Sequence, residues 1–198
     1  MSTPLYALDI ETTHTRVDAG VLRSIAVWSA RSHMVASAEE LGEIDLILGA
    51  LAWLRSQPRG VVVGWNSSGF DVPWLIGRAA SGGIDLAAEG LIYAVPSEDR
   101  PLKYPAVDEH ATGWRVEALA GHRHADIALA WRAWCEETAT PWSLKPVARA
   151  HGLDPLEEDR EHMEDLSDER LLAYNLSDVR VTHELARGLG SGLEDWID

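Results

Sequence analysis

The stretch LYALDIETT, which spans residues 5–13, joins an apolar run to two acids one residue apart, Asp9 and Glu11. Side chains at positions i and i+2 of a β-strand point to the same face. We therefore expect a buried strand over residues 4–9 whose end presents the two carboxylates side by side. Two such close negative charges repel each other, and a bound divalent cation removes this conflict. Carboxylate oxygens are hard ligands that suit Mg²⁺ or Mn²⁺, whereas the alternative is an exposed acidic strand end without a metal.

The composition is that of a soluble globular protein. Of the 198 residues, 46% are apolar and 25% are charged. The sequence contains neither an apolar run long enough for a transmembrane helix nor a secretory signal at its N-terminus. Its single cysteine, Cys135, excludes an internal disulfide and a cysteine-rich zinc site. These features predict a cytoplasmic protein without a membrane partner, folded as a single domain over residues 1–198.

The formal net charge of −15 bears on the kind of partner that the protein can have. Proteins that bind nucleic acid usually carry a basic face, so this chain would be repelled by nucleic acid at long range. Metal ions at the acidic site, together with a few arginines in a local groove, would still allow contact. Binding of that kind would be weak and sensitive to salt.

The pattern of apolar residues predicts an α/β protein. Residues 21–28 and 33–37 read as strands with short connections, and the apolar run 61–64 reads as a strand covered on both faces. The capping box at Ser37 predicts one helix with an apolar stripe from Leu41 to Leu54. Residues 84–125 are insertion-like, a loop or hairpin with strands near 91–95 and 114–120. Further helices are expected after Asp71, over 127–135, over 144–150 and after Ser167.

Three downstream residues stand out by their chemistry. Asp71 ends the run WNSSGFD, and capping a helix explains it as well as a functional role does. Asp178 lies on the apolar face of the helix expected after Ser167, and Tyr174 lies one turn earlier on the same face. Because burial of an unpaired carboxylate is unfavourable, Asp178 requires a partner. A metal shared with the two acids of the first strand would serve.

Other polar residues permit two interpretations each. Lys145 and Arg149 lie one turn apart on one helix face, which is either a solvated face or a contact with phosphate. His122, His124 and Asp126 are of metal-ligating types, but no further ligand at suitable spacing accompanies them. The sequence therefore argues against a metal at the histidines and leaves the role of the lysine open.

The motifs DIETT around Asp9, N-x-x-x-F-D ending at Asp71 and Y-x-x-x-D ending at Asp178 follow one another along the chain. Together they resemble the DEDD superfamily of 3′→5′ exonucleases, in its tyrosine-bearing DEDDy subclass. The middle motif looks most like the proofreading domain of family B DNA polymerases, and SLKPVARAHGL resembles a helix found there. The resemblance spans about residues 4–188. It implies an RNase H-like fold, with a central mixed five-stranded sheet and helices on both faces.

The resemblance also implies an activity, the hydrolysis of phosphodiester bonds from the 3′ end of single-stranded or frayed DNA to nucleoside 5′-monophosphates. Two divalent cations, Mg²⁺ or Mn²⁺, would lie about 3.5–4 Å apart in such a site. By resemblance, Asp9 would bridge both ions, and Asp71 would support the ion that stabilises the leaving oxygen. Glu11 and Asp178 would hold the ion that carries the nucleophilic water. Tyr174 would orient that water.

Some of the expected substrate contacts follow from the same resemblance. By this resemblance Thr12, Asn66 and Phe70 would position the strand. From their residue types alone, Trp65 is a candidate for stacking on a base, and Lys145 is the candidate for a phosphate contact. DNA is favoured over RNA only because the middle motif is polymerase-like, so an exoribonuclease remains an alternative. A non-catalytic module docked on a polymerase or another replication protein and an endonuclease on the RNase H scaffold are the others. Since no polymerase domain follows, a stand-alone nuclease or a separate subunit is expected.

Overall fold

The computed structural model describes residues 3–97, 114–158 and 165–197. None of the helices within these ranges has the length and apolar character needed to cross a membrane. The elements follow in the order β1 (Leu5–Thr12), β2 (Leu22–Trp28), β3 (His33–Ser37), α1 (Ala38–Leu41), α2 (Glu43–Ser56), β4 (Val61–Gly64), α3 (Asp71–Ser81), β5 (Ile92–Pro96), β6 (Trp114–Leu119), β7 (Arg123–Asp126), α4 (Ile127–Thr138), α5 (Leu144–Ala150), α6 (Asp168–Leu189) and the 3₁₀ segment η2 (Gly190–Trp196).

Strand β1 is the centre of a five-stranded sheet with the order β3-β2-β1-β4-β7. It pairs antiparallel with β2 and parallel with β4, while β3 and β7 extend the two sides. The predicted mixed five-stranded sheet is therefore confirmed. Strand β1 also continues to Thr12, beyond the expected end at residue 9, so that both of its acids lie within the paired strand.

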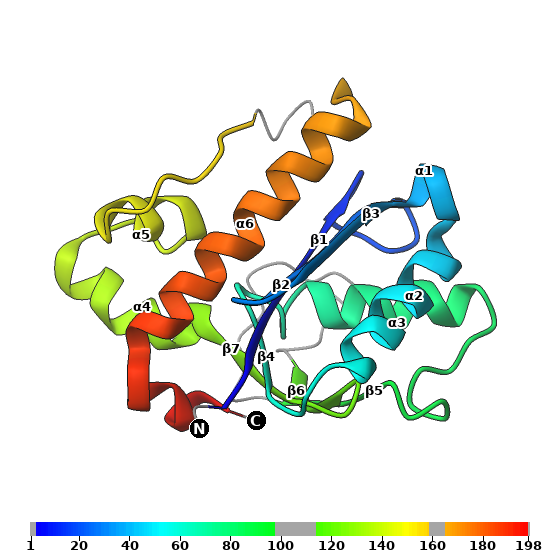
Figure 1. Cartoon of the computed structure of the whole chain (residues 1–198), viewed down its shortest axis with the longest axis horizontal. Helices are drawn as coiled ribbons and strands as arrows, with labels where there is room; N and C mark the ends of the chain where they lie inside the picture. The colour runs from blue at the N-terminus through cyan, green and yellow to red at the C-terminus, as the bar shows by residue number, and fades with distance from the viewer. Residues whose placement is uncertain (1–2, 98–113, 159–164, 198) are drawn as a thin grey trace.

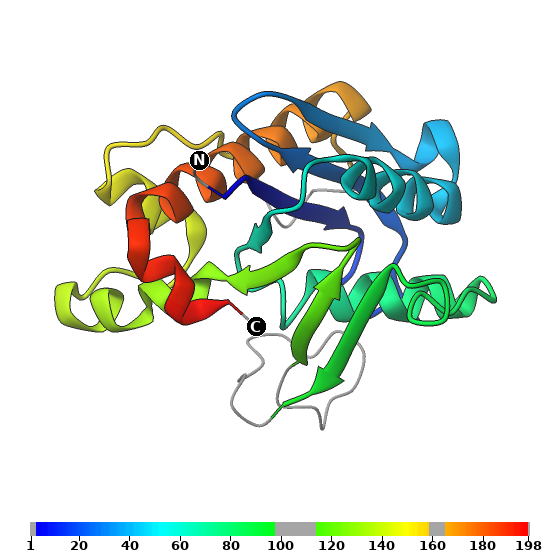
Figure 2. The same cartoon turned by 60° about the horizontal axis from the view of Figure 1, so that its bottom comes forward.

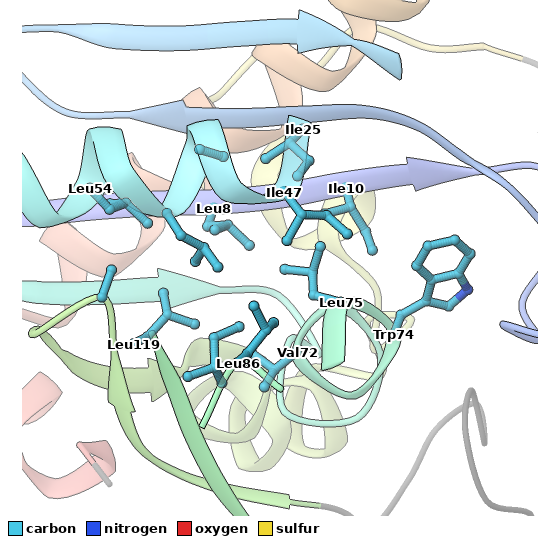
Figure 3. Packing of buried hydrophobic residues seen from close by; sticks show 14 of the residues in the cluster. Leu8, Ile10, Ile25, Ile47, Leu54, Val72, Trp74, Leu75, Leu86 and Leu119 are labelled. Atoms are coloured by element: carbon cyan, nitrogen blue, oxygen red, sulfur yellow. The ribbon is translucent and has the colours of Figure 1, made fainter. Parts of the chain in front are cut away.

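Alternation along β1 directs its side chains into two cores on opposite faces of the sheet. Tyr6, Leu8 and Ile10 belong to the core under α2 and α3, and Figure 3 shows Leu8 and Ile10 on their strand beside Ile47 and Leu75 of the two helices. The other core lies under α4, α5 and α6. Figure 1 shows α6 crossing one face of the sheet while α2 and α3 cover the other. Helices on both faces are thus confirmed, and the acids of β1 share the face of α6 by alternation.

The helix expected after Ser37 is present but interrupted. The Ser37 hydroxyl caps α1 by accepting a hydrogen bond from the Glu40 backbone N–H at 3.3 Å, as predicted. The expectation of one continuous helix is wrong, because Gly42 adopts a φ of 81° and separates α1 from α2. Leu41 consequently lies outside the predicted apolar stripe and is 44% exposed.

The insertion-like region contains a hairpin. Strands β5 and β6 form a separate antiparallel pair, close to the strands expected near 91–95 and 114–120. Figure 2 shows this pair beside β7 at the margin of the large sheet. The remainder of the predicted insertion, residues 98–113, lies outside the described residues. Strand β7 itself was not predicted, because RHAD carries no apolar alternation.

Candidate active site

Three carboxylates converge where β1 meets α6. Asp9, Glu11 and Asp178 each offer an oxygen, and these atoms lie within 4.8 Å of one another. Strand alternation aligns the first two, and α6 brings the third, which is 4% exposed. Within the described ranges this is the one group of at least three metal-ligating side chains. A set of clustered, hard oxygen donors fits a divalent cation such as Mg²⁺ or Mn²⁺.

A fourth carboxylate joins this group through the backbone of β1. Asp71 is 2% exposed, and its Oδ1 accepts a hydrogen bond from the Ile10 N–H at 3.0 Å. Ile10 lies between the two acids of β1, so this bond fixes the start of α3 against them. The interpretation of Asp71 as a helix cap is wrong, because Phe70 occupies the N-cap position and Asp71 is the first helical residue.

Burial of the carboxylates at this site favours the protonated forms of Asp9 and Asp71 in the absence of a cation. Desolvation raises the pKa of Asp71 to about 7, although its backbone hydrogen bonds oppose the shift. Desolvation likewise raises the pKa of Asp9 well above its usual range. The charges of Asp71, Glu11 and Asp178 raise that pKa further. Positive charge is therefore needed to keep all of these groups ionised together.

Part of that positive charge comes from Lys145 on α5. Its ammonium group donates hydrogen bonds to Asp178 Oδ1 and, at 2.6 Å, to the Leu156 carbonyl. It also lies 4.0 Å from the centre of the Tyr174 ring. Lys145 is only 5% exposed, so the solvated-face interpretation is wrong for this residue. Arg149, one turn later, is exposed and pairs with a surface acid.

A cavity of about 730 Å³ opens over the carboxylates. It is lined by every predicted site residue except Lys145, whose ammonium group instead binds the Asp178 carboxylate. A second part of the wall, which no sequence motif indicated, is formed by Pro141, Trp142 and Ser143, just before the helix expected over residues 144–150. The residues that line the cavity are Asp9, Ile10, Glu11, Thr12, Thr15, Trp65, Asn66, Phe70, Asp71, Pro141, Trp142, Ser143, Leu144, Tyr174 and Asp178.

The turn after β4 holds three of the predicted substrate-binding residues, and Asp126 shapes it. The Asp126 carboxylate accepts hydrogen bonds from the backbone N–H groups of Asn66 and Ser68 at 2.9 and 3.0 Å. Asn66 has a φ of 61°, which asparagine tolerates better than most residues. Gly64 is required at the strand end, since a Cβ there would lie 2.4 Å from the Ser67 side chain. Asp126 therefore fixes the backbone of the turn that carries these residues and does not itself line the cavity.

The two histidines near Asp126 have structural roles. His122 accepts a hydrogen bond from the Gly60 N–H at 3.1 Å through Nδ1, and its Nε2 lies 2.8 Å from the Leu54 carbonyl. His124 Nε2 lies 2.9 Å from the Ser67 hydroxyl. Both side chains are buried and hydrogen-bonded within the fold.

Comparison with known proteins establishes the fold. No protein-family model matches the chain, and no curated protein matches its sequence. The family B DNA polymerase from the hyperthermophilic archaeon Pyrobaculum calidifontis is similar in structure, with a TM-score of 0.65 and 24% sequence identity. This chain has an RNase H-like fold. The match covers 96% of this chain but 25% of the polymerase, so the chain spans about a quarter of that protein's length.

We expect the metal-free protein to lose stability as the pH rises from about 5 to about 8. The folded-state pKa of Asp71, about 7, exceeds its ordinary value of 3.8, so the folded protein binds the proton more tightly than the unfolded chain. The resulting stabilisation is complete at low pH and is lost as the pH rises through the folded-state value. In EDTA the melting temperature should fall by at least about 5 °C. Asp71→Asn keeps an acceptor for Ile10 and should flatten this dependence; equal slopes would contradict the assignment.

We expect Lys145→Met to destabilise the metal-free protein, because it leaves the buried Asp178 carboxylate without its cation. Loss of one partner of a buried ion pair costs about 3–5 kcal/mol, which should lower the melting temperature in EDTA substantially. Mn²⁺ should restore part of the loss by binding the same carboxylates. The matched control is Arg149→Met, which removes an exposed pair worth about 0–1 kcal/mol. Equal losses in the two variants, or no rescue by Mn²⁺, would refute this role.

Proposed function

We propose that the chain is a metal-dependent 3′→5′ exonuclease of the DEDDy subclass, acting on single-stranded or frayed DNA. The observation that carries the proposal is the convergence of Asp9, Glu11 and Asp178 within 4.8 Å. Asp71 and Tyr174 line the same cavity, so all five residues of the three sequence motifs border one space. The similarity in fold to a family B DNA polymerase is a further, coarser support.

Asp9, Glu11, Asp71 and Asp178 would hold two divalent cations, Mg²⁺ or Mn²⁺. When bound, such cations lower the pKa of a nucleophilic water and neutralise charge on the attacking and leaving oxygens. The chain's own contribution is to hold four carboxylates in place against their mutual repulsion. The Ile10 N–H holds the Asp71 carboxylate, and the Lys145 ammonium group holds the Asp178 carboxylate.

Tyr174 is the residue that would orient the attacking water. Its side chain lines the cavity one helical turn before Asp178, and the Lys145 ammonium lies over its ring. Because a free tyrosine has a pKa near 10, its hydroxyl would act mainly by positioning and hydrogen bonding. The proton of the water would leave to solvent.

The remaining cavity wall would position the 3′ end of the strand. Thr12, Asn66 and Phe70 border the carboxylates, and Trp65 offers a ring for stacking on a base. A cavity of about 730 Å³ is within the usual range for small-ligand sites, so it has room for a terminal nucleotide. The net charge of −15 favours weak, salt-sensitive binding, and a partner such as a polymerase would relieve this. We place this activity on a single domain over residues 1–198.

We expect the protein to shorten 5′-labelled single-stranded DNA from its 3′ end at low salt with Mg²⁺ or Mn²⁺, but not with EDTA. Asp9→Ala should abolish cleavage, because it removes the carboxylate shared by the proposed ions. The matched control is Asp45→Ala, which removes an exposed acid on α2 and should leave the rate unchanged. RNA of equal sequence, run in parallel, identifies the preferred polymer.

Three outcomes of this digestion would change the proposal. Faster shortening of RNA would make the protein an exoribonuclease. Cutting of a circular single strand would make it an endonuclease. Absence of cleavage with every metal, with and without a polymerase present, would leave a docking role as the better account of the fold.

We expect Tyr174→Phe to lower kcat about 10- to 100-fold with little change in metal affinity, since only the hydroxyl is removed. The phenyl ring keeps its contact with the Lys145 ammonium, so the melting temperature should change little. Single-turnover rates and Mn²⁺ titration by calorimetry separate the two effects. Unchanged turnover would remove Tyr174 from the mechanism.

A further inference from the structure

A tryptophan that no sequence motif singled out lies in the wall of the cavity. Trp142 belongs to the segment between α4 and α5, and it borders the same space as the carboxylates of β1 and α6. Trp65, which directly precedes the middle motif, comes from the turn after β4. Two tryptophans from separate parts of the chain therefore border the cavity.

The Trp142 ring is held in place by α4. Its Nε1–H donates a hydrogen bond to the Ala128 carbonyl at 2.6 Å. The Arg132 guanidinium lies over the ring, 5.2 Å from its centre, and Arg132 Nε is in turn bound by Glu136 Oε1 at 3.1 Å. An aromatic ring fixed on its edge and on one face is a preorganised surface, which loses little freedom when a ligand binds.

The other residues of the cavity make such a surface necessary. Four carboxylates border the cavity, and none of the described residues that line it is a lysine or an arginine. Among the described residues of the lining, attraction for a phosphodiester therefore depends on bound metal ions. Uncharged contacts would add affinity for the rest of the strand, and stacking of bases on aromatic side chains is a main contact of this kind in single-strand binding.

We propose that Trp142 is a stacking platform for a base of the substrate strand and that it makes the cavity selective for unpaired bases. A base within a duplex already has both faces stacked, and a terminal base is still held in its pair, so a base that has left the duplex gains most from the indole ring. The inference rests on the proposed nuclease function and extends it by naming the residue that recognises the heterocycle. Trp142 would contact the substrate directly and take no part in the hydrolysis.

The test compares Trp142→Leu with Trp142→Phe on single-stranded oligonucleotides. Both changes remove the N–H that bonds to the Ala128 carbonyl, but only phenylalanine retains a flat ring. We expect Trp142→Leu to raise KM about tenfold, equivalent to about 1.4 kcal/mol, and Trp142→Phe to raise it much less. Trp134→Leu is the control, because Trp134 contacts Trp131 on α4 and does not line the cavity.

A second series replaces each of the last four nucleotides in turn with an abasic residue. At the position that stacks on Trp142, the abasic residue should raise the KM of the wild-type enzyme by as much as Trp142→Leu does. The same abasic residue should not raise the KM of Trp142→Leu any further. Additive losses at every position, or equal effects of leucine and phenylalanine, would overturn the inference while the nuclease function stands. If the wild-type protein neither binds nor cleaves any oligonucleotide, the nuclease function itself fails. A lowered melting temperature would reveal that Trp142→Leu disturbs the whole fold. In that case the abasic series is repeated with Trp142→Phe.

Discussion

Mutual repulsion of carboxylates in a desolvated recess is the constraint on which the rest of the structure depends. Strand alternation forces Asp9 and Glu11 onto one face, and α6 adds Asp178 from above. Removal from water raises the pKa of Asp9, and the charges of its neighbours raise it further, so positive charge is needed for the group to be ionised together. Lys145 supplies one such charge from within the chain. The remaining charge deficit is the physical reason that the site suits divalent cations.

The elements that carry the acids around this site are packed into the fold. Strand β1 lies at the centre of the sheet between two cores, and α6 is buried along the face that it crosses (Figure 1). The turn after β4 is closed by Gly64 and by the Asp126 carboxylate. Such anchoring is what a site of like charges requires, since any loose acid would move away from its neighbours.

The charge of the whole chain and the lining of the cavity point to one mode of recognition. A protein with a net charge of −15 gains little from long-range attraction to nucleic acid. Its cavity instead combines a floor of clustered carboxylates with two tryptophans in the wall. Metal ions would then engage the phosphate, while the rings would engage the bases. The RNase H-like fold provides both, because its central strand ends next to turns that carry aromatic residues.

Local periodicity and residue type predicted the first strands, the helix starts at Ser37 and Ser167 and the acids of β1 and α6, whereas the mixed five-stranded sheet was expected from the resemblance to the exonucleases. The spacing to Asp178 also indicated Tyr174. Folding turns Lys145 inward to Asp178, and it makes Asp71 accept a hydrogen bond from β1 instead of capping α3. It likewise makes RHAD form β7 and brings Trp142 to the border of the cavity. These features arise from contacts between residues far apart in the chain, which no local pattern records.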